Sequence, residues 1–207
     1  MSDLIWKILS SYTVLPTQMV GANQVRVILE HIEETINIPG DLVEFGCNEG
    51  TTSLFISRFL ELSKSEKHFH VYDSFQGLPD KNIKDGNTSP NFVKGSCSTS
   101  RSKFETNFFQ AGLIPPEIHE GWFEDIKKES IPERVSFAFL DGDFYSSILD
   151  SLSKVYIRMP ARSRIIIHDY NNPALPGVAT ACSEFLADKP EQIIESGCAG
   201  LGLLIKE

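Results

Sequence analysis

The chain has 207 residues, of which 41% are hydrophobic and 23% are charged, as is typical of a soluble globular protein of one domain. Its 19 basic and 28 acidic residues give a formal net charge of −9, which argues against unaided electrostatic binding to nucleic acid or to an anionic membrane. The first residues lack the pattern of a signal peptide, and no apolar run is long enough to span a membrane. We therefore expect a soluble, cytoplasmic protein with reduced cysteines.

Hydrophobic runs alternate with helical patterns along the chain, which predicts an α/β fold built on a parallel sheet. The expected helices are Asp3–Tyr12, Val25–Ile36, Thr52–Leu62, Ser100–Gln110, Ser147–Tyr156 and Pro176–Ala187. The expected strands are Asp41–Phe45, His68–Tyr72, Glu117–Glu120, Val135–Leu140 and Arg164–Ile167, with a closing antiparallel hairpin at Gln192–Glu195 and Gly202–Ile205. Residues 79–98 show no periodicity, and so long a segment within a compact domain is typically a functional loop.

A glycine loop follows the first expected strand. The sequence LVEFGCNEGT (residues 42–51) is an apolar strand that ends in an acid and then opens into a helix. Gly46 and Gly50 allow a tight turn and a close approach of the backbone to a ligand, at the edge where open α/β sheets bind nucleotides. Position 48 is Asn48, so the pattern is E-x-G-x-x-x-G and not the dinucleotide fingerprint GxGxxG. This pattern suits S-adenosylmethionine (SAM), which has no pyrophosphate; a plain strand-to-helix turn is the alternative.

Asp73 ends the second expected strand and begins the sequence DSFQGLP. A carboxylate in that place can accept hydrogen bonds from both hydroxyls of a ribose. Taken alone, Asp73 would be interpreted as a solvated residue in a turn. The neighbouring glycine loop favours the ribose interpretation.

Two further polar clusters follow strands that we expect to be neighbours. They are DGDFYS (residues 141–146) and HDY (residues 168–170). Asp141 and Asp169 would converge at the ligand cleft, where two carboxylates repel unless one is protonated or a cation lies between them. Oxygen ligands favour a hard cation such as Mg²⁺, and Asp141 could accept a proton from a substrate hydroxyl. The alternative is that the aspartates cap the following helices, and His168 is either a ligand or a core residue.

Aromatic residues outside these clusters have two interpretations each. Trp122 could stack on an adenine ring or belong to the core. Phe104 and Phe108, four residues apart on an expected helix, are typical of the core.

Together these motifs resemble the macrocin O-methyltransferase family, the sugar O-methyltransferases of macrolide biosynthesis and their relatives. The matching pieces are TQMVG (17–21), PGDLVE (39–44) with Gly46 and Gly50, DSFQGLP (73–79), GWF (121–123), DGDFYS (141–146) and DY (169–170). The resemblance runs from Thr17 to Leu186. The order and spacing of the pieces are more specific than any one of them.

The resemblance implies a class I SAM-dependent methyltransferase (Rossmann-like) fold, which is a seven-stranded sheet with a reversed last strand and helices on both faces. We expect one methyltransferase domain over residues 1–207, with a helical N-terminal cover (1–38) and a SAM-binding core (39–207). Residues 79–98 are the expected lid or acceptor loop, because they follow the SAM motif and lack periodicity. The predicted cofactor-binding residues are Met19, Glu44, Gly46, Asn48, Gly50, Thr51, Asp73, Ser74, Gly121, Trp122 and Asp141.

The resemblance also implies a divalent metal, usually Mg²⁺, held by Asp141, His168 and Asp169, with Asp141 as general base, and it suggests a homodimer. The family typically has two aspartates where this chain has His168-Asp169, and a histidine favours softer ions than Mg²⁺. The chain is shorter than the macrolide enzymes, which favours a small or exposed acceptor such as a terminal deoxysugar.

The leading hypothesis is therefore a SAM-dependent O-methyltransferase acting on a sugar hydroxyl, in a small molecule or at the end of a glycan. Nucleic acid and membrane are not expected partners. A catechol or small-phenol O-methyltransferase is the second hypothesis, and a SAM-binding module without turnover is the third. A dehydrogenase is disfavoured because GxGxxG is missing.

Overall fold

The computed structural model of the chain describes residues 1–11, 16–198 and 200–207. Its centre is a seven-stranded sheet in the order β3-β2-β1-β4-β5-β7-β6. The strands are β1 (Asp41–Phe45), β2 (Phe69–Asp73), β3 (Glu117–Glu120), β4 (Val135–Leu140), β5 (Arg164–His168), β6 (Ile194–Glu195) and β7 (Leu201–Ile205). β1 to β5 are mutually parallel, whereas β7 runs antiparallel to β5 and β6 antiparallel to β7. The prediction of a seven-stranded sheet with a reversed last strand is confirmed.

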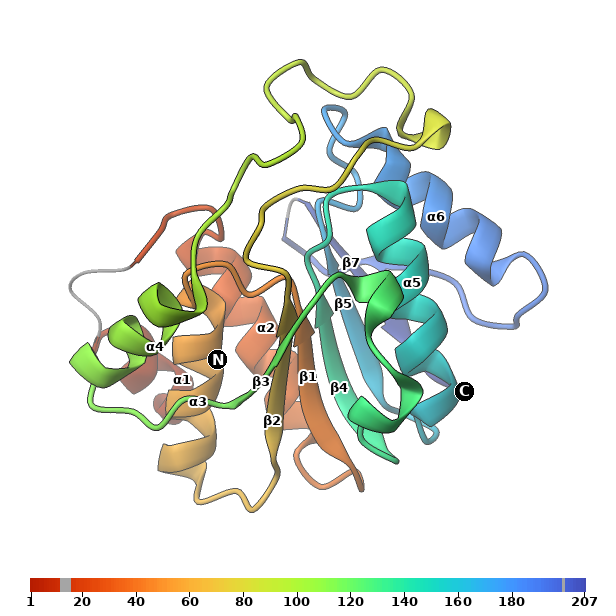
Figure 1. Cartoon of the computed structure of the whole chain (residues 1–207). Coiled ribbons are helices and arrows are strands. Elements are labelled where there is room, and N and C mark those ends of the chain that lie inside the picture. The colour runs from red at the N-terminus through yellow and green to blue at the C-terminus, as the bar shows by residue number, and fades with distance from the viewer. Residues whose placement is uncertain (12–15, 199) are drawn as a thin grey trace.

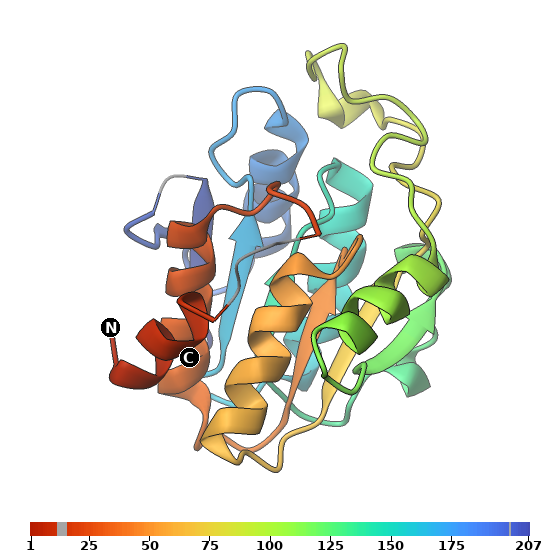
Figure 2. The same cartoon turned by 90° about the vertical axis from the view of Figure 1, so that its left-hand side faces the viewer.

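The middle of the sheet is apolar because helices cover both of its faces. All six residues of β4 are buried, as expected of a parallel strand with no solvent-facing side. The helices are α1 (Asp3–Leu9), α2 (Ala22–Thr35), α3 (Thr51–Ser63), α4 (Arg101–Gln110), α5 (Tyr145–Val155) and α6 (Pro176–Leu186). α1 to α4 lie on one face and α5 and α6 on the other, and each group forms its own apolar cluster with the sheet (Figures 1 and 2).

Most helix boundaries differ from expectation by a few residues, because apolar periodicity identifies the buried face and not the first turn. α2 begins three residues early because Gly21 caps it, with its N–H donating to Gln24 Oε1 at 2.8 Å. The first helix ends at Leu9, and Tyr12, where the prediction ended it, lies outside the described residues. Phe104 and Phe108 of α4 are fully buried in the core, as expected.

The expected loop 79–98 rises above the carboxyl ends of the strands and reaches α6 (Figure 1). It contains one 3-10 turn, Ile83–Asp85, whose Asp85 is buried. Asp85 Oδ1 accepts the N–H of Tyr145, the first residue of α5, at 2.7 Å, and its Oδ2 accepts the N–H of Asn82 at 2.7 Å. A carboxylate from the loop therefore serves as the N-terminal cap of a helix far away in the sequence.

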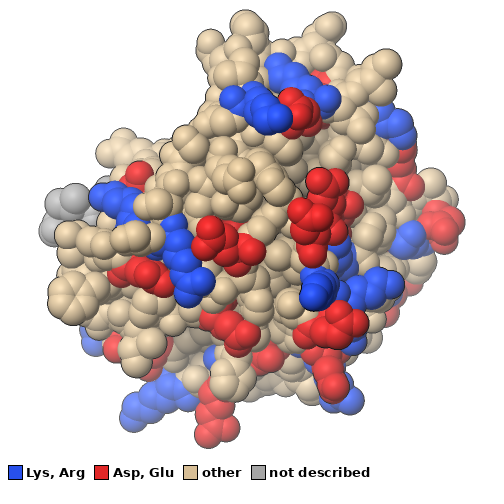
Figure 3. All heavy atoms as spheres, in the orientation of Figure 1, with Lys and Arg blue, Asp and Glu red and all other residues tan. Residues whose placement is uncertain are grey.

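On the face drawn in Figure 3, acidic side chains lie beside most of the basic ones. Among the helices that the structure describes, none is long and apolar enough to cross a membrane.

Candidate active site

The carboxyl ends of β1, β2, β4 and β5 open into one cavity of about 340 Å³. Nine predicted site residues line it: Met19, Gly46, Asn48, Asp73, Ser74, Trp122, Asp141, His168 and Asp169. They come from segments far apart in the sequence. Apart from Met19, which precedes α2, each ends or follows a parallel strand, and the pairing of these strands brings them together.

The glycine loop after β1 lies against the end of β4. Gly46 has φ +89°, and a Cβ built on it would lie 2.0 Å from the carbonyl oxygen of Asp141. Its N–H donates to Tyr72 O at 2.9 Å, and the N–H of Asp141 donates to Phe45 O at 2.8 Å. The absence of a side chain at position 46 therefore allows the β1 and β4 ends to approach each other at the cavity floor.

Backbone N–H groups hold the Asp73 carboxylate in place. Asn48 N–H donates to its Oδ2 at 2.8 Å, and Phe75 N–H donates to its Oδ1 at 2.7 Å. Burial raises the pKa of Asp73, although these hydrogen bonds act to lower it. Each carboxylate oxygen has more than one lone pair, so the group retains capacity to accept hydrogen bonds from a diol.

Asp141, His168 and Asp169 form a compact cluster at the ends of β4 and β5. His168 Nδ1 lies 2.9 Å from Asp141 Oδ1 and 3.2 Å from Asp169 Oδ2, and one ligand atom from each residue lies within 4.8 Å of the others. The His168 side chain is 8% exposed, whereas those of Asp141 and Asp169 are 20% and 19% exposed. The two carboxylates thus share one imidazole nitrogen at the wall of the cavity.

The two carboxylates set the protonation of His168. Burial alone would lower the pKa of His168, but Asp141 and Asp169 raise it to about 11. On the far side of the ring, Gln24 Nε2 lies 3.2 Å from His168 Nε2, and the Gln24 oxygen already accepts the Gly21 N–H. At that pKa the ring carries a proton on both nitrogens: Nδ1–H lies between the two carboxylates, and Nε2–H faces the Gln24 amide, whose oxygen can accept it when the amide is turned over.

Several residues of the cavity wall have backbone conformations that residues other than glycine rarely adopt. Four of its non-glycine residues have left-handed φ: Asn48 (47°), Cys97 (63°), Asp143 (59°) and Asp169 (56°). Such conformations concentrate at functional sites because surrounding structure must stabilise them. Burial, together with the charges of Asp141 and Asp169, raises the pKa of Asp143 to about 8.

Four predicted cofactor residues do not line the cavity. Glu44 is 1% exposed behind the glycine loop, where Ser53 Oγ donates to it at 2.5 Å and burial raises its pKa to about 8. Gly50 precedes α3 and packs against Phe104. Thr51 Oγ1 accepts the Thr17 N–H at 3.0 Å, and Gly121 N–H donates to Asp73 O at 2.9 Å. These residues support the segments that carry Met19, Asp73 and Trp122.

The cavity also has lining residues that sequence reasoning did not single out. They are Gly77, Leu78, Pro79, Phe92, Cys97, Phe123, Gly142, Asp143, Ser147 and Asn172. Six of them lie within the motifs DSFQGLP, GWF and DGDFYS, so the motifs were the available signal for Gly77, Leu78, Pro79, Phe123, Gly142 and Asp143. Phe92 comes from the middle of the 79–98 loop and has no local signal.

The helix-capping alternative for the two aspartates does not match the described hydrogen bonds. α5 is capped by Asp85, and α6 has Leu175 as its N-cap with no side-chain hydrogen bond. Asp169 instead accepts a hydrogen bond from Asn172 Nδ2 at 3.0 Å. Trp122 is partly exposed at the cavity and is not a core residue.

Sheet order, the reversed β7 and the cavity at the carboxyl ends of the strands define a class I SAM-dependent methyltransferase fold. The family model described as macrocin O-methyltransferase matches residues 11–195. The chain belongs to this family.

Two curated relatives are named as O-methyltransferases, and the name of the first describes a rhamnosyl compound. The chain is 30% identical over 152 residues to the 8-demethyl-8-(2,3-dimethoxy-alpha-L-rhamnosyl)-tetracenomycin-C 4'-O-methyltransferase of Streptomyces olivaceus, covering 69% of this chain and 58% of that protein. It is 27% identical over 174 residues to the mycinamicin III 3''-O-methyltransferase of Micromonospora griseorubida, covering 79% and 68%. The chain thus spans roughly three fifths to two thirds of the length of these relatives.

Solved structures agree with the fold. The O-methyltransferase NovP superposes with a TM-score of 0.82 at 25% identity, covering 91% of this chain and 81% of that one. An O-methyltransferase from Bacillus cereus in complex with SAH superposes with a TM-score of 0.60 at 14% identity, covering 100% and 92%, and supports the fold alone.

Proposed function

We propose that this chain transfers the methyl group of SAM to a hydroxyl of a sugar, in a small glycoside or at the end of a glycan. The observation that carries the proposal is the convergence of Gly46, Asp73 and the Asp141–His168–Asp169 cluster on one cavity. Family membership supports O-methylation, and the rhamnosyl compound in the name of the Streptomyces olivaceus relative supports a sugar acceptor.

In this proposal SAM lies along the glycine loop. Asp73 accepts hydrogen bonds from its ribose, because Asn48 and Phe75 already hold the carboxylate at the mouth of the loop. Trp122 lies at the cavity and offers an aromatic face to adenine. Met19 lines the same cavity from the N-terminal segment and covers the cofactor.

The acceptor hydroxyl lies beside Asp141, which takes its proton. The acceptor oxygen forms a bond to the methyl carbon as the carbon–sulfur bond breaks, and S-adenosylhomocysteine leaves. Most of the rate gain comes from holding the two reactants in line, and proton acceptance by Asp141 adds to it. His168 donates to Asp141 and so orients the carboxylate.

The donor set of the cluster fits a divalent cation, because two carboxylates and one imidazole lie within 4.8 Å. Asp141, His168 and Asp169 would hold the ion, Mg²⁺ or another divalent cation. When bound, such an ion would lower the pKa of the acceptor hydroxyl. His168 would then need its proton on Nε2, with the Gln24 amide turned over to accept it.

The 79–98 loop is the proposed determinant of acceptor choice. Pro79, Phe92 and Cys97 bring this loop to the cavity, so changes in the loop alter the lining without replacing any residue of the Asp141–His168–Asp169 cluster. Replacement of the loop tip with a short linker should change acceptor preference and leave the affinity for SAM unchanged. Unaltered preference would contradict this role.

A mass-spectrometric assay of methyl transfer from SAM tests the proposal. The panel contains free sugars, rhamnosides and other glycosides, and catechols, each with Mg²⁺ and after EDTA treatment. We expect product with glycosides and a lower rate after EDTA. Product with catechols alone would favour the small-phenol alternative, and SAM binding without any product would favour the non-catalytic module. An unchanged rate in EDTA would remove the metal from the mechanism.

A homodimer stays a prediction of the family resemblance. Light scattering coupled to gel filtration measures it, and a monomeric mass would contradict it.

A further inference from the structure

A second group of potential metal ligands lies outside the cavity, at the β2–β3 edge of the sheet. His70 is on β2, and Glu117 and His119 are on β3. None of the three lines the cavity described above. The register pairs His70 with Glu117 and Tyr72 with His119, so the period of two places all four side chains on one face of the sheet.

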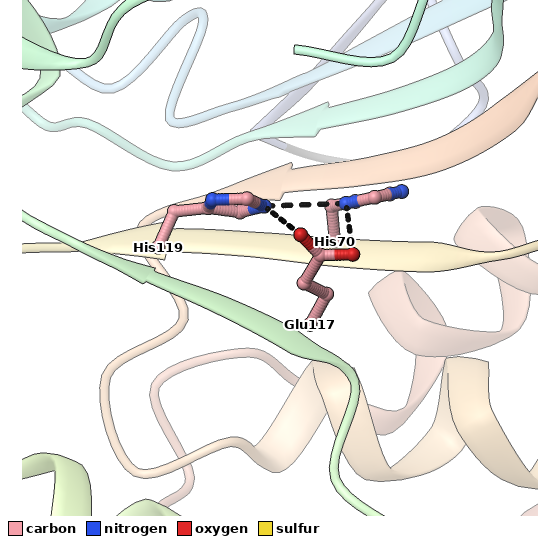
Figure 4. Close-up of side chains that lie close together, drawn as sticks. All are labelled: His70, Glu117 and His119. Carbon is pink, nitrogen blue, oxygen red and sulfur yellow. Dashed lines mark hydrogen bonds and ion pairs between the residues drawn. The ribbon is translucent and has the colours of Figure 1, made fainter. Parts of the chain in front are cut away.

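The potential ligand atoms of the three residues, which include both carboxylate oxygens of Glu117, lie close together. Figure 4 shows the ring nitrogens of His70 and His119 facing each other, with Glu117 reaching both. His70 Nδ1 lies 3.2 Å from His119 Nε2 and 3.5 Å from Glu117 Oε2, and His119 Nε2 lies 3.4 Å from Glu117 Oε1.

These separations match metal ligands better than hydrogen bonds to a carboxylate. Charge-assisted N–H···O bonds are typically about 2.7–2.9 Å long, and both contacts of Glu117 are longer. Ligand atoms about 2.0–2.1 Å from a tetrahedral Zn²⁺ are roughly 3.3 Å apart.

Neighbouring residues hold the two histidines in place. The ring of His119 stacks on Tyr72, with centroids 4.6 Å apart and planes at 10°, and Tyr72 Oη donates to Ser130 O at 2.7 Å. Asp41 Oδ2 lies 4.0 Å from His70 Nε2, on the side from which carboxylates orient ligating histidines. The side chains of His70 and His119 are only 12% and 15% exposed, whereas Glu117 is 64% exposed, so an ion can enter from solvent.

We propose that His70, Glu117 and His119 form a binding site for a divalent transition-metal ion, with Zn²⁺ the best match. Two imidazoles and one carboxylate are a donor set typical of zinc sites that leave the fourth position to water. An ion there cross-links β3, which has a strand neighbour on one side only, to β2. β3 leads directly into Gly121 and Trp122, so the ion would also stabilise the cavity wall that Trp122 forms.

The test measures Zn²⁺ binding to tag-free protein by competition with a chromogenic chelator. The background variant D141N/D169N removes the carboxylates of the other cluster. We expect it to retain one Zn²⁺ equivalent, and addition of His119→Asn to weaken that binding by more than about tenfold. His68→Asn is the matched control, because His68 is exposed just before β2 and should leave binding unchanged.

A second measurement keeps the proposal testable if a variant fails to fold. In wild-type protein, long-range ¹⁵N–¹H NMR of the imidazoles should show Zn²⁺ on Nδ1 of His70 and on Nε2 of His119. Zn²⁺ binding that His119→Asn leaves unchanged would overturn the proposal. So would His70 and His119 resonances that do not respond to Zn²⁺. Neither readout depends on methyl transfer, so failure here is distinct from failure of the proposed function.

Discussion

The carbonyl oxygen of Asp141 lies where the side chain of any other residue at position 46 would have to go. Gly46 also has a φ that disfavours other residues, so two separate costs act on the same substitution. Asp141 is the proposed base, and Gly46 is part of the proposed cofactor loop. A side chain at position 46 would therefore displace the backbone of Asp141.

Gly46→Ala should therefore abolish SAM binding and lower the free energy of unfolding by about 3 kcal/mol or more. Calorimetric titration with SAM and urea unfolding measure the two effects. Gly112→Ala is the matched control: Gly112 also has a positive φ, +66°, but a Cβ there meets nothing within 4 Å. The Gly112→Ala variant should lose about 1 kcal/mol of its free energy of unfolding and should bind SAM as the wild type does. Equal losses in the two variants would show that strain alone, and not the Asp141 contact, sets the requirement.

At this scale the sequence allowed prediction of the residues that directly follow strands. Asp73, Asp141 and Asp169 were predicted because parallel strands bring their carboxyl ends together. The sequence did not distinguish cavity residues from their supports. Glu44 follows the same pattern, yet its side chain points behind the loop to Ser53, because side chains alternate along a strand.

Among the elements, the 79–98 loop has the attachment that the sequence could least predict. Its composition predicts an irregular segment, and this is largely what the structure shows. Its attachment could not be predicted, because the partner of Asp85 is a backbone N–H of α5, sixty residues further along the chain. Asp85 therefore holds the loop close to the elements that carry the proposed base.

Asp85→Ala should release the loop, because it removes the cap of α5 and leaves its first N–H without this partner. We expect faster hydrogen exchange and faster proteolysis within residues 79–98, and a loss of stability of about 1–2 kcal/mol. Asp80→Ala is the control in the same loop, since Asp80 is 79% exposed and pairs with the exposed Lys94. If hydrogen exchange in the loop is the same in both variants, Asp85 does not anchor it.

For the whole molecule, one buried ion pair couples stability to pH. Glu191 is 1% exposed at its side chain and contacts Lys206 Nζ at 2.6 Å, just beyond the end of β7. Burial alone would raise the pKa of Glu191, but hydrogen bonds from Lys206 and Tyr156 lower it to about 2. The lowered pKa means that the pair stabilises the fold above pH 4.5 and that this contribution is lost as the pH falls toward 2.

Glu191→Gln should remove on the order of 2–3 kcal/mol of this pH-dependent stability. Denaturant unfolding should be measured between pH 7 and pH 2. At neutral pH the free energy of unfolding of the variant should be well below that of the wild type, and the difference should shrink as the pH falls through 4.5. Glu66→Gln, at an exposed position, should follow the wild-type curve throughout. A deficit that stays constant with pH would mean that packing, and not ionisation, accounts for the role of Glu191.

The topology of the whole sheet was largely predictable, because strand order follows from buried apolar runs joined by helical crossovers, and the family resemblance implied the reversed last strand. The His70–Glu117–His119 cluster was not predictable in the same way. His70 is far from Glu117 and His119 in the sequence, and the cluster depends on the register of β2 against β3, which alternation alone does not define.

The most direct test of the central claim is the effect of Asp141→Asn on turnover and on SAM affinity, measured on the same preparation with a glycoside acceptor. The substitution keeps the shape of the side chain and removes its ability to accept a proton. We predict that SAM affinity stays within a few-fold of wild type, while methyl transfer falls by at least about a hundredfold. Near-normal turnover in this variant would contradict the assignment of Asp141 as the base.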